Sequence, residues 1–248
     1  MSGTIDLVDP EHPKRVLMVL PNAAVSPQTG WPVGFWWSEL THAYWEFVEH
    51  GYTVRIVSPD GGTLVADSWS DPRDDSGYSG DDLISLGFIN SAKHYALIEN
   101  TTPLAEVSVN DFDTVFFVGG QSPMVTFVDD QRVHDLAVAF HEAGKVTTAV
   151  CHATSILLRA TRPNGELLVA GKTWTGFANS EEDFADDYVG QQIQPFRIED
   201  RARELKGTNF VVNSRFKPYA VRDGLLITGQ QQFSGAAAAR LVIEALGI

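Results

Sequence analysis

The sequence predicts an α/β protein in which helices cover both faces of a mostly parallel sheet, as a three-layer α/β/α sandwich. Short apolar runs rich in β-branched residues alternate along the chain with helical patterns, which is typical of a parallel sheet. Most of these runs end at glycine or proline, and their continuous apolar character favours strands buried on both faces. The chain has 248 residues, 44% of them hydrophobic and 10% aromatic, so it can fill a sizeable core.

The strand patterns are clearest in the first 150 residues. Four runs there are short, apolar and β-branched: RVLMVLP (15–21), TVRIVSP (53–59), TVFFVGG (114–120) and VTTAV (146–150). Three later segments also predict strands: GKTWTGF (171–177), FVVN (210–213) and LLITG (225–229).

Three segments have apolar residues at helical spacing and end at a glycine: 34–51, 131–144 and 233–247. Glycine commonly ends a helix because it adopts the left-handed backbone conformation without strain. We therefore expect helices that stop near Gly51, Gly144 and Gly247.

Residues 61–110 interrupt the alternation of strands and helices. The stretch DSWSDPRDDSGYSGDD within it is polar and rich in turn-forming residues. We expect this segment to be an insertion or cap over one edge or end of the sheet. Because no linker separates the elements, residues 1–248 are predicted to form a single domain.

Composition excludes several classes of partner and site. The net charge of −14 opposes binding to DNA, RNA or an anionic membrane. A single cysteine excludes an internal disulfide and Cys-based zinc or iron–sulfur sites. The first 21 residues lack the pattern of a signal peptide, and no run approaches the roughly 20 apolar residues that span a bilayer. We expect a cytoplasmic protein.

The one cysteine, Cys151, falls where an apolar strand ends and a helical pattern begins, in VTTAVCHATSILLRA (146–160). Ligands of parallel sheets bind beyond the carboxyl ends of the strands. A sharp strand-to-helix turn at that edge exposes one side chain and directs backbone N–H groups towards it. A helix N-terminus also favours the thiolate. Cys151 is therefore a candidate nucleophile, although most free cysteines are simply small buried hydrophobes.

Five motifs in order resemble those of the DJ-1/PfpI superfamily, which has the class I glutamine-amidotransferase-like fold, and most closely its Hsp31-like glyoxalase III branch. The resemblance implies a flavodoxin-like sheet with a nucleophile elbow, in which the chain turns sharply at the cysteine. The motifs are VGFWWSEL (33–40), FFVGGQSP (116–123), AVCHATSILL (149–158), GKTWTGFANSEE (171–182) and DGLLITGQQQFSGAAAARLVIEAL (223–246).

The resemblance also implies roles for individual residues. Cys151 matches the nucleophile, and Glu39 matches the first-helix glutamate that hydrogen-bonds the cysteine sulfur and takes part in proton transfer. Burial beside Cys151 would raise the pKa of Glu39 and keep it protonated. His152 matches the histidine that pairs with an acid from a later loop.

Glu182 is the best match to that acid, although Glu181 and Asp183 are neighbours that could be confused with it, and a helix-capping role is the alternative. Gly120 and the backbone of His152 match the oxyanion hole, whose N–H groups stabilise a negative oxygen.

One departure from the branch concerns the substrate. Gln121 stands where a histidine commonly follows the glycine pair, and a glutamine can donate a hydrogen bond but cannot move a proton at neutral pH. Trp36 and Trp174 lie in matched motifs and are expected, with Gln121, to border the substrate pocket, although core packing explains most such tryptophans. Aromatic walls favour a small or an apolar substrate.

The function implied by the resemblance is that of an enzyme acting on a small carbonyl compound, as glyoxalase III converts methylglyoxal to lactate. No cofactor, glutathione or metal is implied. The alternatives are an Hsp31-type holding chaperone or oxidative-stress sensor, and an amidase or peptidase of the PfpI type. Amidotransferases of this fold place the histidine far downstream of the cysteine, which counts against that last class. Many relatives are dimers, so a homodimer is possible.

Overall fold

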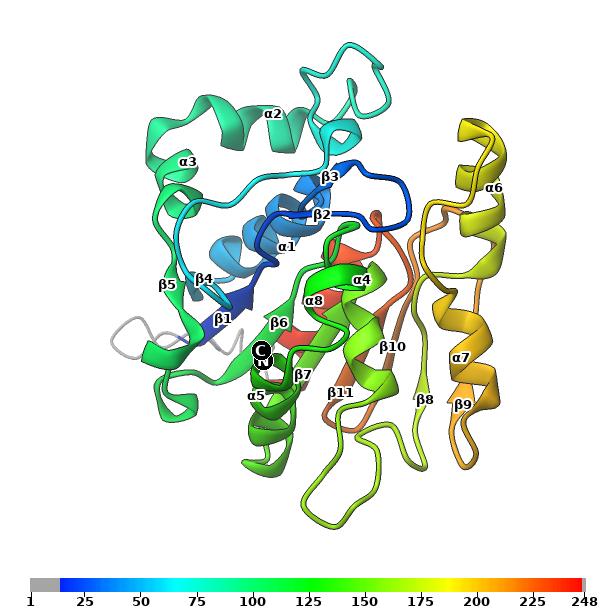
Figure 1. Ribbon diagram of the computed structural model, residues 1–248. Helices are drawn as coiled ribbons and strands as arrows, with labels where there is room; N and C mark the ends of the chain where they lie inside the picture. Colours follow the sequence, from blue (N-terminus) through cyan, green and yellow to red (C-terminus); the bar gives the residue numbers. More distant parts are fainter. Residues whose placement is uncertain (1–13, 247–248) are drawn as a thin grey trace, which may run out of the picture.

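A central sheet of seven strands organises the computed structural model, which describes residues 14–246 (Figure 1). The strand order is β10-β11-β7-β6-β1-β4-β5, and every neighbouring pair is parallel except β10 with β11. The inner order β4-β1-β6-β7-β11 is the 2-1-3-4-5 order of flavodoxin-like sheets, so the predicted fold class is confirmed. The strands of this sheet are β1 (Arg15–Val19), β4 (Thr53–Ser58), β5 (Thr102–Pro103), β6 (Thr114–Phe117), β7 (Val146–Val150), β10 (Ala220–Asp223) and β11 (Leu226–Gly229).

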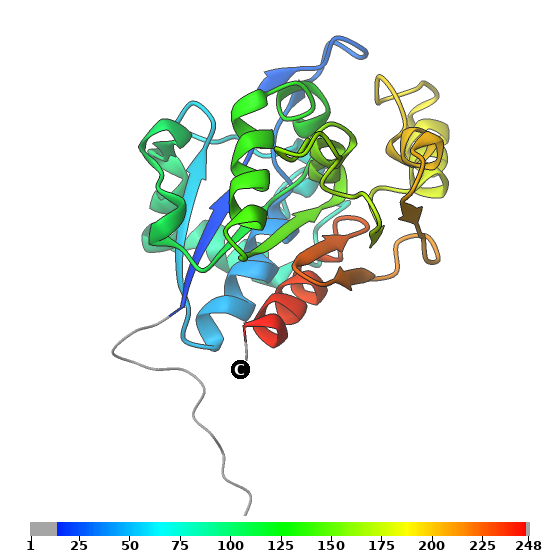
Figure 2. The ribbon, with the colours of Figure 1, turned by 90° about the horizontal axis from the view of Figure 1, so that it is seen from below.

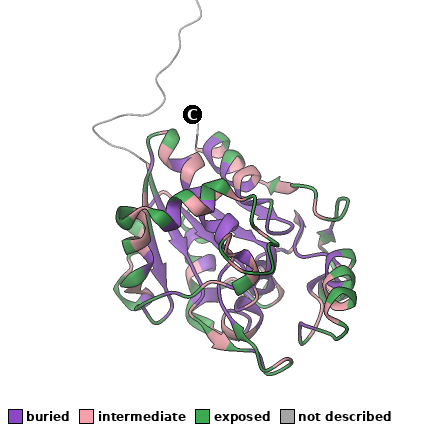
Figure 3. Cartoon of the chain, turned by 90° about the horizontal axis from the view of Figure 1, so that it is seen from above, coloured by how far each residue is buried: buried purple, intermediate pink, exposed green. Residues whose placement is uncertain are grey.

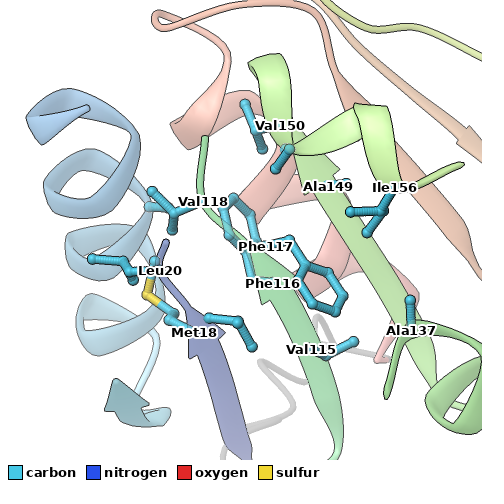
Figure 4. Close-up of a cluster of buried hydrophobic side chains, with 14 of the residues drawn as sticks. Met18, Leu20, Val115, Phe116, Phe117, Val118, Ala137, Ala149, Val150 and Ile156 are labelled. Atoms are coloured by element: carbon cyan, nitrogen blue, oxygen red, sulfur yellow. The ribbon is translucent and has the colours of Figure 1, made fainter. Parts of the chain in front are cut away.

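The four apolar runs predicted first become the middle of the sheet. β6 and β7 are buried along their whole length, because helices cover both of their faces. Figure 4 shows Phe116, Phe117 and Val115 of β6 packed beside Ala149 and Val150 of β7. This continuous burial is the reason that the strands show no apolar-polar alternation in the sequence.

Two of the weaker strand predictions lie outside this sheet. Segments 171–177 and 210–213 contribute β8 (Thr173–Trp174) and β9 (Asn209–Phe210), which pair only with each other. The third segment, 225–229, becomes β11 in the main sheet, beside β7. A separate short hairpin precedes the first helix and consists of β2 (Ala24–Val25) and β3 (Pro32–Val33).

Helices form the two outer layers. One face carries α1 (Trp37–Glu49) and α8 (Gly235–Ala245), which pack against each other. The other face carries α4 (Pro123–Thr126) and α5 (Gln131–Glu142), and Figure 2 shows the two layers on opposite sides of the strands. Gly51 and Gly144 follow their helices with φ of +77° and +73°, as their stop signals predict. Gly247 lies outside the described residues.

Residues 61–110 lie over the α1 side and the β4 edge of the sheet. Helix α2 packs on α1, and β5 extends the sheet beyond β4. That this segment is an insertion within a single domain stays a prediction. Its helical elements, in chain order, are η1 (Ser68–Ser70), α2 (Leu83–Asn90), α3 (Ala92–Glu99), η2 (Leu104–Glu106) and η3 (Val109–Asp111).

A second group of elements flanks the opposite edge of the sheet. It consists of β8, β9, α6 (Asn179–Val189) and α7 (Ile198–Glu204), to the right in Figure 1. Seen from above, the buried residues concentrate at the centre of the molecule, between these two flanking groups (Figure 3). Within residues 14–246, no helix is both long and apolar enough to cross a membrane.

Candidate active site

Cys151 lies at the point where β7 ends, with a backbone conformation that few residues other than glycine adopt. Its φ is +58°, and Phe216 is the other non-glycine residue with positive φ among residues 14–246. Such strain persists only where the surrounding structure enforces it, and it is common at active sites. The chain continues directly into η4 (Cys151–Leu158), a 3-10 helix, where the sequence pattern predicted a helix. This geometry is that of a nucleophile elbow.

His152 connects the cysteine to a buried acid. Its Nδ1 lies 3.4 Å from Cys151 Sγ, and its Nε2 lies 3.0 Å from Glu182 Oε1. Because the Glu182 carboxylate can only accept, Nε2 carries the proton and Nδ1 is left as an acceptor facing the sulfur. The ring also stacks on Phe177, with centroids 4.1 Å apart, which fixes its plane.

The two neighbours of Glu182 have other partners. Asp183 is on the surface and pairs with Arg197. Glu181 is fully buried but accepts hydrogen bonds from the backbone N–H of Ala178 (3.0 Å) and Phe216 (3.1 Å) and from the side chain of Gln230 (2.8 Å). Of the three candidates, the structure brings Glu182 to His152.

Glu39 extends from α1 to the other side of the cysteine and is fully buried. Its Oε2 accepts a hydrogen bond of 2.7 Å from the N–H of Gly119. Its Oε1 makes no well-formed hydrogen bond within residues 14–246, yet Cys151 is close enough for the two acidic groups to shift each other's pKa. Burial raises the pKa of Glu39 to about 8, so this carboxyl group is mostly protonated at neutral pH, as the sequence argument expected.

The proposed oxyanion-hole groups face the sulfur. The backbone N–H groups of Gly120 and His152 interact with Cys151 and lower its pKa. Gly120 has φ of +108°, and a Cβ atom there would lie 2.5 Å from the carbonyl oxygen of Gly34. Glycine is therefore required for both the conformation and the close approach.

The thiol itself differs from the sequence expectation. The start of a helix suggested a lowered pKa, but burial of Cys151, which is 2% exposed, raises its pKa well above the usual value, and the neighbouring Glu39 raises it further. The two N–H donors oppose this only in part. The resting cysteine is therefore mainly a thiol, and His152 must take its proton during reaction.

A cavity of about 60 Å³ opens onto Cys151 and His152. Gln121 and Trp36 line it, as predicted. Trp174 does not: it lies on β8, is fully buried, packs edge-on against Phe210 of β9, and donates its indole N–H to Thr208 Oγ1 at 2.8 Å. For Trp174, core packing is the correct interpretation.

Most of the aromatic wall was not predicted. It comes from the η1 region and the loop after it, from the loop before α6, from α6 itself and from the loop before β10, and its members are Trp69, Tyr78, Phe177, Phe184, Tyr188 and Phe216. These segments carry no strand or helix periodicity that points to the site. The signal that could have revealed them is the presence of Trp69 and Tyr78 in an otherwise polar stretch, since isolated large aromatics there need a reason.

Among the residues that the structure describes, no group of three or more His, Cys, Asp or Glu side chains is arranged to hold a metal ion. The chemistry assembled around the cavity is a buried thiol between a protonated carboxyl group and an imidazole, with two N–H donors for a negative oxygen. This set can add sulfur to a carbonyl carbon and move protons on the adduct.

Comparison with known proteins decides the family. The model of the DJ-1/PfpI family matches residues 34–245, which is most of the chain. The chain belongs to the DJ-1/PfpI family. It is 27% identical over 237 residues to the glutathione-independent glyoxalase HSP31 of Saccharomyces cerevisiae, covering 94% of this chain and 98% of that protein.

Solved structures with a similar fold agree. The Rapid Encystment Protein 24 KDa of Francisella tularensis superposes with a TM-score of 0.83 at 26% identity, covering 95% of this chain and 100% of that one. Glyoxalase III of Candida albicans superposes with a TM-score of 0.77 at 24% identity, covering 94% and 97%, and this similarity concerns the fold.

Proposed function

We propose that this family member is a glutathione-independent glyoxalase, which uses Cys151 to convert a small 2-oxoaldehyde such as methylglyoxal, with water, into the 2-hydroxy acid. The observation that carries the proposal is the line Cys151–His152–Glu182, with Glu39 on the other side of the sulfur and a small, aromatic-walled cavity above it. The similarity to a yeast glutathione-independent glyoxalase supports it.

The first step is addition of sulfur to the aldehyde. His152 Nδ1 accepts the thiol proton, while the Glu182 carboxylate stabilises the imidazolium that results. The thiolate forms a carbon–sulfur bond to the aldehyde carbon, and the carbonyl electron pair moves to oxygen, where the N–H groups of Gly120 and His152 stabilise it. Return of the proton from the imidazolium gives a neutral hemithioacetal.

Proton transfer between the two substrate carbons follows. A base, either His152 or Glu39 in its ionised form, removes the proton from the carbon bonded to sulfur, and the electrons move to the neighbouring ketone to give an enediolate. A proton delivered to that second carbon produces the thioester of the 2-hydroxy acid. Water then adds to the thioester carbon, the sulfur leaves as thiolate and is reprotonated, and lactate is released from methylglyoxal with no net oxidation.

Features of the site favour a glyoxalase over the alternative functions. A peptidase needs a groove for an extended chain, whereas Cys151 opens onto a cavity walled largely by aromatic side chains. A thiol sensor is accessible and has a low pKa, whereas Cys151 is 2% exposed and burial raises its pKa. A holding chaperone would not need the ordered cysteine, histidine and acid. The homodimer and the cytoplasmic location stay predictions.

The test is lactate formation from methylglyoxal without glutathione. We expect turnover by the native protein and a loss of at least about 10³-fold in Cys151→Ala, because sulfur addition is the first step. A protein that produces no lactate, or a Cys151→Ala variant as active as the native protein, refutes the proposal. Prevention of client aggregation by both proteins alike would then favour the chaperone.

A further inference from the structure

Asp67 is a buried carboxylate close to the site that the reaction above does not use. It lies in the chain between β4 and α2, within the segment 61–110, and is 2% exposed. No lysine or arginine pairs with it in the described part of the chain, where its carboxylate oxygens accept hydrogen bonds from backbone N–H groups. A carboxylate is costly to bury, so a side chain held in this way is expected to fix something.

The two oxygens of Asp67 connect two segments that are far apart in the sequence. Oδ1 accepts a hydrogen bond of 2.8 Å from the N–H of Gly34, just before α1, and Oδ2 accepts one of 2.7 Å from the N–H of Gln121. The backbone N–H of Asp67 in turn donates to the carbonyl oxygen of Phe35 at 2.8 Å. Asp67 therefore joins the entry to α1 with the end of the glycine turn 119–121.

The backbone segments at this junction are packed too closely for side chains. A Cβ atom at Gly34 would lie 1.9 Å from the carbonyl oxygen of Val65, and one at Gly120 would lie 2.5 Å from that of Gly34. The N–H of Ser122 also donates to Gly34 at 3.0 Å. At this spacing one short carboxylate reaches both N–H groups.

The turn that Asp67 holds carries two catalytic contacts. The N–H of Gly119 donates to Glu39, and the N–H of Gly120 faces Cys151. We propose that Asp67 is a positioning residue of the active site, which fixes the turn 119–121 so that its N–H groups point at Glu39 and at the sulfur. The segment 61–110 thereby contributes to the site as well as to its aromatic wall.

Asp67 also affects the site through its negative charge, and a test must distinguish this effect from that of its hydrogen bonds to the backbone. Glu39 on α1 and His152 on η4 are the titratable groups that interact with it, and the charge of Asp67 raises the pKa of Glu39. Burial raises the pKa of Asp67 to about 7. Loss of this negative charge alone would make the thiolate of Cys151 easier to form, whereas loss of the contact with Gly120 would make it harder.

The direction of the change in Asp67→Asn therefore tests the proposal. Asparagine has the same shape but one acceptor oxygen, so one of the two backbone N–H groups would face an amide donor. We expect the pKa of Cys151 to rise, measured by thiolate absorbance in the ultraviolet, and its alkylation by iodoacetamide at pH 8 to slow by about threefold to tenfold. Since Cys151 is the only cysteine in the chain, both readouts are specific.

Asp82→Asn is the matched control, because Asp82 is also in the segment 61–110 and caps α2 by accepting from the N–H of Ser85 at 3.0 Å. We expect it to lower the melting temperature and leave the thiol titration unchanged. A pKa of Cys151 that is unchanged or lowered in Asp67→Asn overturns the proposal. These readouts need no turnover, so they remain decisive if the glyoxalase activity that the proposal builds on is not found.

A second measurement on the native protein applies if Asp67→Asn does not fold. In an NMR titration, the amide resonances of Gly34 and Gln121 should shift together with a midpoint near 7, as Asp67 gains a proton and loses acceptor capacity. The amide of Gly120 should follow with the same midpoint. If these amides titrated with different midpoints, the proposal that the Asp67 carboxylate holds both backbone segments would be contradicted.

Discussion

Glu181 and Glu182, two adjacent buried glutamates of α6, have different roles because they have different hydrogen-bond partners. Glu182 supports His152, and Glu181 holds the backbone of Phe216 in a left-handed conformation beside the cavity. Both are acids in the first turn of one helix, so the sequence alone could not assign them separate tasks. The hydrogen-bond partners make the assignment because each carboxylate points to a different side of the helix.

Glu182→Gln should lower kcat by about 10²-fold or more and change KM little. The amide can still accept a hydrogen bond from His152, but it no longer stabilises the imidazolium that forms when the thiol loses its proton. Steady-state kinetics with methylglyoxal measures this effect. Asp183→Asn is the matched control, because Asp183 is exposed and pairs with Arg197 outside the site, and its kcat should stay within about twofold of native. Equal losses in both variants would contradict the role of Glu182.

At the scale of the element, the site depends on two turns that approach each other, the elbow at Cys151 and the glycine turn after β6. The sequence identified both, because each follows a strand with a distinctive apolar pattern. It could not predict their separation. A Cβ at Gly119 would lie 2.7 Å from Glu39 Oε2 and 2.9 Å from the Cβ of Cys151, so the glycine pair is required by contacts with residues remote in the chain.

Gly120→Ala should therefore destabilise the protein far more than Gly144→Ala, which introduces backbone strain but no steric clash. Both Gly120 and Gly144 have positive φ, but a Cβ at Gly144 has no neighbour within 4 Å. We expect Gly144→Ala to lower the free energy of unfolding by about 1 kcal/mol. Gly120→Ala should cost at least about 3 kcal/mol, because it adds a backbone clash. Urea unfolding measures both, and similar losses would show that the turn can relax.

For the whole molecule, the sequence predicted the middle of the sheet better than its surroundings. β6 and β7, nearly all of β1 and the second half of β4 are buried on both faces, so their apolar runs are unmistakable, and the elbow follows from where β7 ends. The short pair β8 and β9 carries the same kind of residues, yet it forms a separate sheet, because pairing partners are set by tertiary packing.

The residues that line the cavity were also poorly predicted from the sequence. Trp69 and Tyr78 lie in a polar segment, and Trp174 lies in a matched motif, yet the first two line the cavity and the third is core. Asp67 was not recognisable either, because one aspartate among many in an acidic stretch has no local mark of burial. Motifs located the reacting residues, but the residues that surround and orient them came from segments without periodicity.

The burial of Glu39 and Asp67 also makes the stability of the whole protein depend on pH in an unusual direction. Most carboxyl groups have a lower pKa in the folded state than in the unfolded chain, so their contribution to the free energy of unfolding increases as pH rises. Here burial raises the folded-state pKa of Glu39 to about 8 and that of Asp67 to about 7, whereas unfolded carboxyl groups titrate near about 4. At pH values between the unfolded and the folded pKa, Glu39 and Asp67 hold protons in the folded protein that they have released in the unfolded chain.

The contribution of Glu39 and Asp67 to the free energy of unfolding should consequently fall as pH rises from about 4.5 to about 8, since a group lowers stability wherever it binds more protons in the native state. In Glu39→Gln the part of this fall due to Glu39 disappears. Urea unfolding at pH 5 and pH 8 should show a difference smaller by roughly 3 kcal/mol in Glu39→Gln than in the native protein. Glu204→Gln, a change at an exposed glutamate of α7, should leave the difference unaltered. An equal difference in the native protein and Glu39→Gln would mean that Glu39 keeps its ordinary pKa in the fold, and its role as a protonated partner of Cys151 would have to be abandoned.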